Sequence, residues 1–178
     1  MTTQSRWTES CKWLDQAVAL RPDLGAGWLE LGMLSLAESK AGEGLRHFAR
    51  AREFLPQDPW IPLHTAKALS QLKRPTEAIQ QAQEAIKLDP AFWEAHSFLG
   101  EELAIAGRTA EAQKEFEAVL RLQPNHPLAH LNLGVALFQQ GHADDAARHF
   151  ETALRLDPML TVAKQYLQQL KARPGTSH

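Results

Sequence analysis

Apolar side chains recur along the chain at the spacing of one helix face. In one stretch they stand at i, i+4, i+7 and i+8, as Ala146, Phe150, Ala153 and Leu154. The stretch before it carries a similar set, made up of Leu133, Gly134, Leu137 and Phe138. Such spacing is typical of amphipathic α-helices. The pattern predicts an all-α chain with helices of about 13 residues, each roughly 20 Å long.

Prolines divide the chain at a fixed interval of 34 residues. They stand at Pro22, Pro56, Pro90, Pro124 and Pro158. Because proline cannot continue the hydrogen-bond ladder of a helix, each one is expected to end a helix. Two further columns keep this register: Gly32, Ala66, Gly100 and Gly134, and then Phe48, Ala82, Phe116 and Phe150. Several columns in one register indicate an internal repeat.

Glycines mark the turn inside two of the repeat units. Gly107 and Gly141 fall between the expected helices, where glycine adopts a positive φ without strain. The second unit has Lys73 in the same slot. Its Pro75 is expected near the start of a helix, because the first N–H groups of a helix have no intrahelical partner.

The segment 129–158 resembles a tetratricopeptide repeat, a helix–turn–helix unit of 34 residues. Counting from Gly25, the chain holds four such repeats, 25–58, 59–92, 93–126 and 127–160. The resemblance covers nearly the whole chain. It implies an α-solenoid of antiparallel helix pairs, a right-handed superhelix with a long concave surface. The fold by itself does not identify a partner.

The two ends of the chain differ from the repeats. Residues 1–24 have room for one helix only, so they are interpreted as a half-repeat that Pro22 closes. No other segment is expected to cover its Trp7 and Trp13. Either these side chains fold back on the first repeat as a local cap, or this end of the chain is a truncation or docks on another chain. At the other end, 161–172 is predicted to be an amphipathic capping helix, and 173–178 a frayed tail.

The family resemblance implies that the first helix of each repeat lines the concave surface. The side chains expected on this face form a peptide-binding groove of Leu29, Met33, Leu36, Trp60, Leu63, Lys67, Glu94, Glu101, Leu131, Val135, Phe138 and Gln139. The groove is predicted to be apolar at both ends and acidic between them. An apolar surface of this size favours a partner that covers it, an apolar or amphipathic segment with a basic centre. The alternative is that tight winding buries these side chains between repeats.

Two specialisations of the family do not transfer to this sequence. Members that clamp a C-terminal carboxylate carry lysine and asparagine where this chain has Leu29 and Met33. Members that grip peptide backbone carry a ladder of asparagines, and only Asn132 remains of it here. The type of segment that the groove binds therefore has to be inferred from the residues of this chain.

Composition and charge exclude several classes of function. The 178 residues carry a formal net charge of −2, so binding to nucleic acid is not expected. No apolar run approaches the roughly 20 residues of a membrane span, and the first residues lack a signal-peptide core. The default expectation is a cytoplasmic protein that does not insert into membranes.

Candidate chemistry is sparse. His126 and His130 stand at i, i+4, but no third metal ligand is obvious. The only cysteine, Cys11, has no local base to activate it. Nothing in the sequence assembles an acid, a base and an oxyanion site. We therefore expect neither enzymatic activity nor a metal or other cofactor.

The sequence thus predicts a scaffold or adaptor that binds a peptide or protein segment in its concave groove. One alternative is a structural module that forms a homo-oligomer through its N-terminal helix. Another is a repeat segment of a larger multidomain protein whose activity lies elsewhere, which the half-repeat favours.

Overall fold

The computed structural model describes residues 13–172. Within that range the secondary structure is helical without strands, so the all-α prediction is confirmed. Residues 13–20 are helical. The helices that follow are α2 (Gly25–Ala37), α3 (Ala41–Phe54), α4 (Trp60–Gln71), α5 (Pro75–Leu88), α6 (Trp93–Ile105), α7 (Thr109–Leu122), α8 (Pro127–Gln139), α9 (Ala143–Leu156) and α10 (Thr161–Ala172). None of the helices in this part of the chain is long and apolar enough to cross a membrane.

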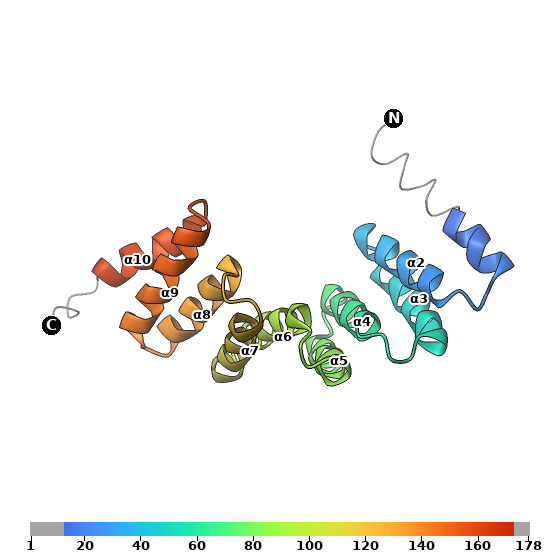
Figure 1. The fold of residues 1–178 in the computed structure, drawn as a ribbon, viewed down its shortest axis with the longest axis horizontal. Coiled ribbons are helices and arrows are strands. Elements are labelled where there is room, and N and C mark those ends of the chain that lie inside the picture. The colour runs from blue at the N-terminus through green and yellow to red at the C-terminus, as the bar shows by residue number, and fades with distance from the viewer. Residues whose placement is uncertain (1–12, 173–178) are drawn as a thin grey trace, which may run out of the picture. The chain divides into compact units, whose positions relative to one another are not determined.

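The helices pack as consecutive pairs, α2 with α3, α4 with α5, α6 with α7, and α8 with α9 (Figure 1). Each pair falls within one of the four predicted 34-residue ranges. Pro75 stands at the start of α5, as expected. Trp7, expected at an uncovered end, and the tail 173–178, expected to be frayed, lie outside the described residues.

The chain divides into two compact units at a repeat boundary. Unit 1 is Met1–Phe92 and unit 2 is Trp93–His178. Unit 1 holds α2 to α5, and unit 2 holds α6 to α10. Each unit is a stack of two helix pairs, and in unit 2 the additional helix α10 packs against α9.

The repeating glycine and phenylalanine columns form the core of three helix pairs. Phe48, Phe116 and Phe150 are at most 2% exposed. A Cβ atom added to Gly32 would lie 2.2 Å from Cε1 of Phe48, and one added to Gly134 would lie 2.7 Å from Cε1 of Phe150. The aromatic ring therefore occupies the space that a side chain on the facing helix would need.

The second repeat solves the same packing problem with two small residues. Ala66 and Ala82 take the places of the glycine and the phenylalanine, and both are completely buried. Two alanines fill less space than a glycine and a phenylalanine, so this helix pair lacks the large-and-small contact of the other repeats.

The turn between paired helices has a left-handed residue in every repeat. This residue is Ser39 (φ 60°), Lys73 (φ 60°), Gly107 (φ 74°) or Gly141 (φ 86°). The two glycines confirm the expectation of positive φ. In the other two repeats the turn imposes the same backbone on residues with a Cβ atom, which is strained.

Replacing Lys73 by glycine is expected to raise the free energy of unfolding of unit 1 by about 1 kcal/mol, because the left-handed strain is relieved. Gln80 is exposed in the middle of α5 and provides the control. Gln80→Gly should lower the same free energy by about 1 kcal/mol through lost helix propensity. Chemical denaturation measures both, and a loss of stability in Lys73→Gly would contradict the strain.

Helix α10 covers the last pair through one aromatic side chain. The Tyr166 ring stacks on Phe150 at 5.0 Å between centroids and meets Phe138 edge to face at 5.2 Å. Ala163 and Leu170 of the same helix are buried. The apolar side of α10 is thus used for packing within unit 2.

Candidate functional site

The apolar stripe predicted on α2 is largely used inside unit 1. Leu29, Met33 and Leu36 are half-buried and pack against a core cluster that includes Ile61 and Ala68 of α4. Side chains on the first helix of one repeat therefore meet the first helix of the next. For this stretch the alternative, burial between repeats, accounts for the pattern better than an open groove.

Two side chains assigned to the groove are buried, and their assignment is corrected. Leu63 is 0% exposed and Leu131 is 8% exposed. The reason is that α4 contacts α2, α3 and α5, whereas α8 contacts α6, α7 and α9. A first helix with neighbours on three sides keeps only a narrow open face. These leucines stabilise the core and do not present a surface to a partner.

Phe138 is half-buried and lies against Tyr166 of α10, so its place in the groove stays a prediction. Glu94 and Lys67 are half-buried on α6 and α4 respectively. Neither of these charged side chains lines the pocket that α6 and α8 form, described below.

Trp60 belongs to an aromatic cluster in unit 1. The imidazole of His64 lies between the Phe48 ring, at 5.8 Å and 18°, and the Trp60 ring, at 5.7 Å and 22°. Phe92 meets Trp60 edge to face at 4.6 Å. Trp60 is nevertheless 40% exposed, so one side of the cluster faces solvent.

His64 is held in its neutral form by this environment. Burial and, to a smaller extent, the positive charge of Lys67 lower the pKa of His64 to about 4, against the opposing effect of Asp58. An imidazolium between two apolar rings would lose its hydration without gaining a hydrogen bond. Unit 1 therefore contains a group whose charging opposes folding.

Stability of unit 1 is expected to fall as the pH decreases from about 6.5 to 4. The unfolded chain binds a proton at His64 near pH 6.5, whereas the folded chain binds it near the cited pKa of about 4, so acid favours unfolding. We expect a loss of about 2 kcal/mol, reduced from the full linkage value because the ring is partly exposed. His64→Gln should remove this part of the pH dependence. Equal pH slopes for both proteins in chemical denaturation would contradict the assignment.

A pocket of 260 Å³ lies in unit 2, and we call it the α6–α8 pocket. Three residues assigned to the groove line it, Glu101 from α6 and Val135 and Gln139 from α8. The other lining residues are Ala104, Ile105, Phe116, Asn132 and Ala136. This part of the predicted groove is brought together as a pocket in unit 2.

The lining of the α6–α8 pocket is mostly aliphatic, with polar groups at a few points. The Glu101 carboxylate accepts a long hydrogen bond from Ser97 Oγ at 3.5 Å. Gln139 Oε1 accepts one from Thr109 Oγ1 at 3.3 Å. The volume is below the roughly 300 to 1,000 Å³ of typical small-molecule sites. It suits one or two side chains of a bound segment better than a cofactor.

Ile105 is the most exposed of the pocket residues that sequence reasoning missed. Its side chain is 79% exposed at the last residue of α6. The signal was present in the sequence, because an isoleucine stands two positions before the turn glycine, Gly107. An isoleucine this exposed provides apolar surface at the edge of the pocket that a partner would cover favourably.

His130 stands in the repeat position that Trp28 occupies in the first repeat. Trp28 Nε1 donates to the carbonyl oxygen of Pro22 at 2.9 Å, and His130 Nε2 lies 3.0 Å from the equivalent oxygen of Pro124. His130 therefore performs the role of the tryptophan in the same repeat position. Across residues 13–172, no group of three or more histidine, cysteine or acidic side chains is placed to hold a metal ion.

Comparison with protein families gives a match to the model described as Tetratricopeptide repeat, over residues 63–112 and 102–159. A curated relative, the Small glutamine-rich tetratricopeptide repeat-containing protein 2 of Mycosarcoma maydis, is 32% identical over 77 residues. That alignment covers 43% of this chain and 22% of the relative. The chain therefore spans about a fifth of that protein.

Solved structures of similar fold cover most of the chain. YrrB, described as a TPR protein with an unusual peptide-binding site, has a TM-score of 0.76 and 21% identity, covering 93% of this chain and 86% of its own. MamA has a TM-score of 0.79 and 18% identity, with 88% and 91% covered. MamA of Desulfovibrio magneticus RS-1 has a TM-score of 0.77 and 21% identity, with 83% of each chain covered. At these identities the likeness establishes the helical-repeat fold.

Proposed function

Because the chain belongs to the tetratricopeptide repeat family, whose members are protein-interaction modules, we propose that it binds a segment of a partner protein at the α6–α8 pocket. The observation that carries this proposal is the pocket itself. It is open, mainly aliphatic, and formed mostly by the first helices of two successive repeats, with Phe116 of α7. Family members of this kind act as scaffolds, and no enzymatic step is proposed.

The lining of the pocket defines the chemistry of the segment. An aliphatic side chain would enter between Ala104, Val135 and Ile105, where it loses contact with water. A neighbouring lysine or arginine would meet the Glu101 carboxylate. The amides of Asn132 and Gln139 offer both donors and acceptors to the backbone of an extended segment. The peptide-binding site for which YrrB is described is consistent with such a role for this fold.

Site-specific photo-crosslinking tests the proposal. A benzophenone side chain replaces Gln139, which is exposed at the pocket, or Gln80, which is exposed on α5 of unit 1. After irradiation in cells that express the full chain, mass spectrometry identifies the cross-linked segments. We expect the Gln139 position to capture a defined segment with an aliphatic and a basic residue. Identical adducts from both positions, or none from Gln139, would contradict the proposal.

Exposed side chains on the first described helix favour a second candidate, self-association. Trp13 is 66% exposed and Leu20 is 82% exposed on the helical segment 13–20. A second copy that covered this surface would remove both side chains from water. Light scattering over micromolar to millimolar concentrations should then detect a dimer that Leu20→Gln weakens. A monomer at every concentration would exclude this candidate.

A further inference from the structure

The interface between α4 and α5 lacks the ring contact that holds the other helix pairs together. In those pairs a buried phenylalanine lies against a glycine of the facing helix, as Phe116 does against Gly100. A Cβ atom added to Gly100 would lie 2.6 Å from Cε1 of Phe116. In the second repeat the same two positions hold Ala66 and Ala82. Two alanines supply fewer atoms for contact across the pair, so α5 is held to α4 less strongly at this point.

A side-chain contact that crosses the helix pair in the other repeats is also missing. It joins two positions that lie 19 residues apart. The pairs are Trp28 with His47, His96 with Glu115, and His130 with His149. In the second repeat the same two positions hold Pro62 and Gln81. Because the side chain of a proline has neither a donor nor an acceptor, it cannot form a hydrogen bond with Gln81.

The side chain of Gln81 is left with a buried atom that has no partner. Its Oε1 is buried and accepts no hydrogen bond from any group within residues 13–172. In the first repeat Ser35 Oγ lies 3.1 Å from His47 Nδ1, and the position of this serine is taken by Leu69 in the second repeat. A buried oxygen that has lost water without gaining a hydrogen bond opposes the packing of α5 on α4.

Helix α4 is anchored by contacts that do not involve α5. The ring of His64 lies 5.8 Å from that of Phe48 on α3. Ile61 and Ala68 belong to the core cluster against which side chains of α2 pack. The missing contacts therefore weaken the attachment of α5, and they leave α4 in its stack with α2 and α3.

The chain is also held on both sides of α5. Before it, α4 is fixed in the stack, and after it Phe92 meets Trp60 of α4 edge to face at 4.6 Å. Phe92 is only 6% exposed. Between these anchors α5 has an ion pair to α3, Arg52 with Glu84 at 3.7 Å, which is partly exposed and contributes little. The segment 72–91 is thus a loop with fixed ends, and the entropy of such a loop favours its local opening.

We propose that α5 is an opening helix: it separates from α4 in a local unfolding step while α2, α3 and α4 stay packed. Openings of this kind need less free energy than unfolding of the whole unit where the packing is weakest. The step also releases the strained turn at Lys73, which has a φ of 60°. In the open form the face of α4 that carries Ala66 becomes accessible. Because α5 belongs to unit 1, this step does not depend on the α6–α8 pocket of unit 2.

Native-state hydrogen exchange of the full chain, measured by NMR at low guanidinium concentrations, tests the proposal. The probes in α5 are the amides of Ile79, Ala82 and Ala85, whose side chains are buried. We expect their protection factors to be at least about tenfold lower than those of Leu69 in α4 and Val119 in α7. Equal protection in α4 and α5, which would show that the pair opens as one unit, would overturn the proposal. Protection in α5 equal to that in α7 would also overturn it.

A transplanted side-chain pair tests the cause of the opening. Pro62→His with Gln81→Glu gives the second repeat the residues whose equivalents in the third repeat lie 2.7 Å apart. The control is Pro62→His with Gln80→Glu, because Gln80 is exposed on the same helix. We expect the protection factors of α5 to be about tenfold higher in the first variant than in the control.

A second substitution at the same site does not require a new hydrogen bond. Gln81→Leu removes the unpartnered oxygen and should also raise the protection factors of α5, whereas Gln80→Leu should leave them unchanged. Unchanged protection of α5 in both the transplanted pair and Gln81→Leu would overturn the proposal. Failure of the cross-link at Gln139 would contradict binding at the α6–α8 pocket and leave these results untouched.

Discussion

Gly32→Ala is expected to lower the free energy of unfolding of unit 1 by about 3 kcal/mol. The added Cβ atom would lie 2.2 Å from Cε1 of Phe48 and 2.5 Å from its Cδ1. Phe48 is 1% exposed, so its ring has no free space into which it can turn. Either the ring leaves its rotamer or the paired helices separate, and both responses cost packing energy.

The measurement is guanidinium denaturation followed by tryptophan fluorescence in a Trp93→Phe background, which leaves tryptophans only in unit 1. Gly42→Ala is the matched control, because an added Cβ atom there meets nothing within 4 Å. It should raise stability by about 0.5 kcal/mol through helix propensity. Equal effects of the two substitutions would show that the close approach of Gly32 to Phe48 does not hold the pair together.

The repeat register could be predicted from the sequence because its determinants lie within one helix pair. Gly32 and Phe48 touch across a short turn, and the same contact recurs at Gly134 and Phe150. The turn between the helices likewise depends on one residue, such as Gly141. These local contacts repeat at a fixed distance along the chain and leave a periodic pattern.

The binding surface could be predicted only in part, because exposure depends on neighbouring repeats. Leu63 and Leu131 lie on the expected helical face and are covered by adjacent helices. Phe138 is half-buried against Tyr166, which belongs to the helix after the last repeat. Helical spacing specifies which residues share a face and does not specify how wide a face the packed neighbours leave open.

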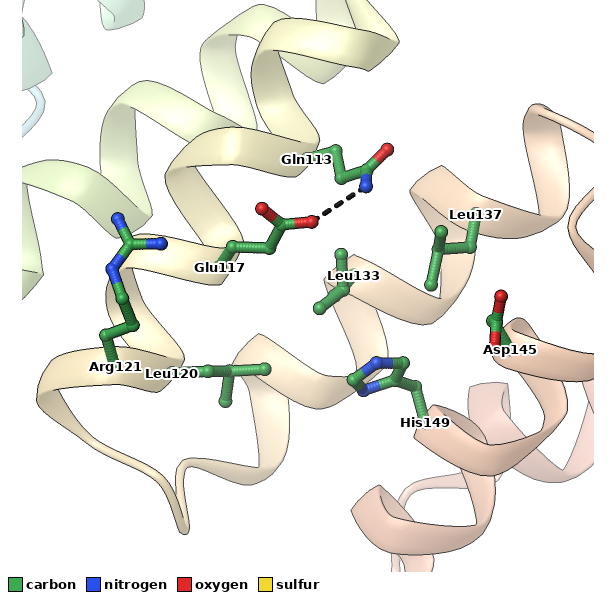
Figure 2. A pocket seen from close by; sticks show the side chains of 8 residues that line it. All are labelled: Gln113, Glu117, Leu120, Arg121, Leu133, Leu137, Asp145 and His149. Carbon is green, nitrogen blue, oxygen red and sulfur yellow. Dashed lines mark hydrogen bonds between the residues drawn. The ribbon is translucent and has the colours of Figure 1, made fainter.

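A further pocket of unit 2, lined by α7, α8 and α9 (Figure 2), could not be predicted from the helical face that the family resemblance indicates. Its polar side chains come from two successive repeats, with Glu117 on α7 and His149 on α9. His149 in turn meets His130 through the two Nδ1 atoms at 3.0 Å. Contacts of this kind between helices leave no periodic signal in a sequence.

Val135→Glu is expected to weaken binding of the partner segment at least about a hundredfold, which corresponds to about 2.7 kcal/mol. The substitution places a carboxylate in the aliphatic wall of the α6–α8 pocket, beside Glu101. Binding would then require this charge to lose water without a partner. The half-buried position faces the pocket, so the helical content of the variant should remain that of the wild type.

The matched control is Val162→Glu, a valine of α10 that is 44% exposed and does not line the pocket. Fluorescence anisotropy with the segment identified by cross-linking gives the dissociation constants. The control should stay within about twofold of the wild type, because a charge on an exposed surface remains solvated. A similar loss in both variants would indicate a general effect of added negative charge.

The central claim is that the α6–α8 pocket is where a partner segment binds. Its most direct test is an NMR titration of the 15N-labelled full chain with the synthetic segment captured from the Gln139 position. Shifts should concentrate on amides of Glu101 to Ile105 in α6 and of Asn132 to Gln139 in α8. They should disappear in Val135→Glu. Saturable shifts on other helices only, with these two stretches unchanged, would contradict the claim.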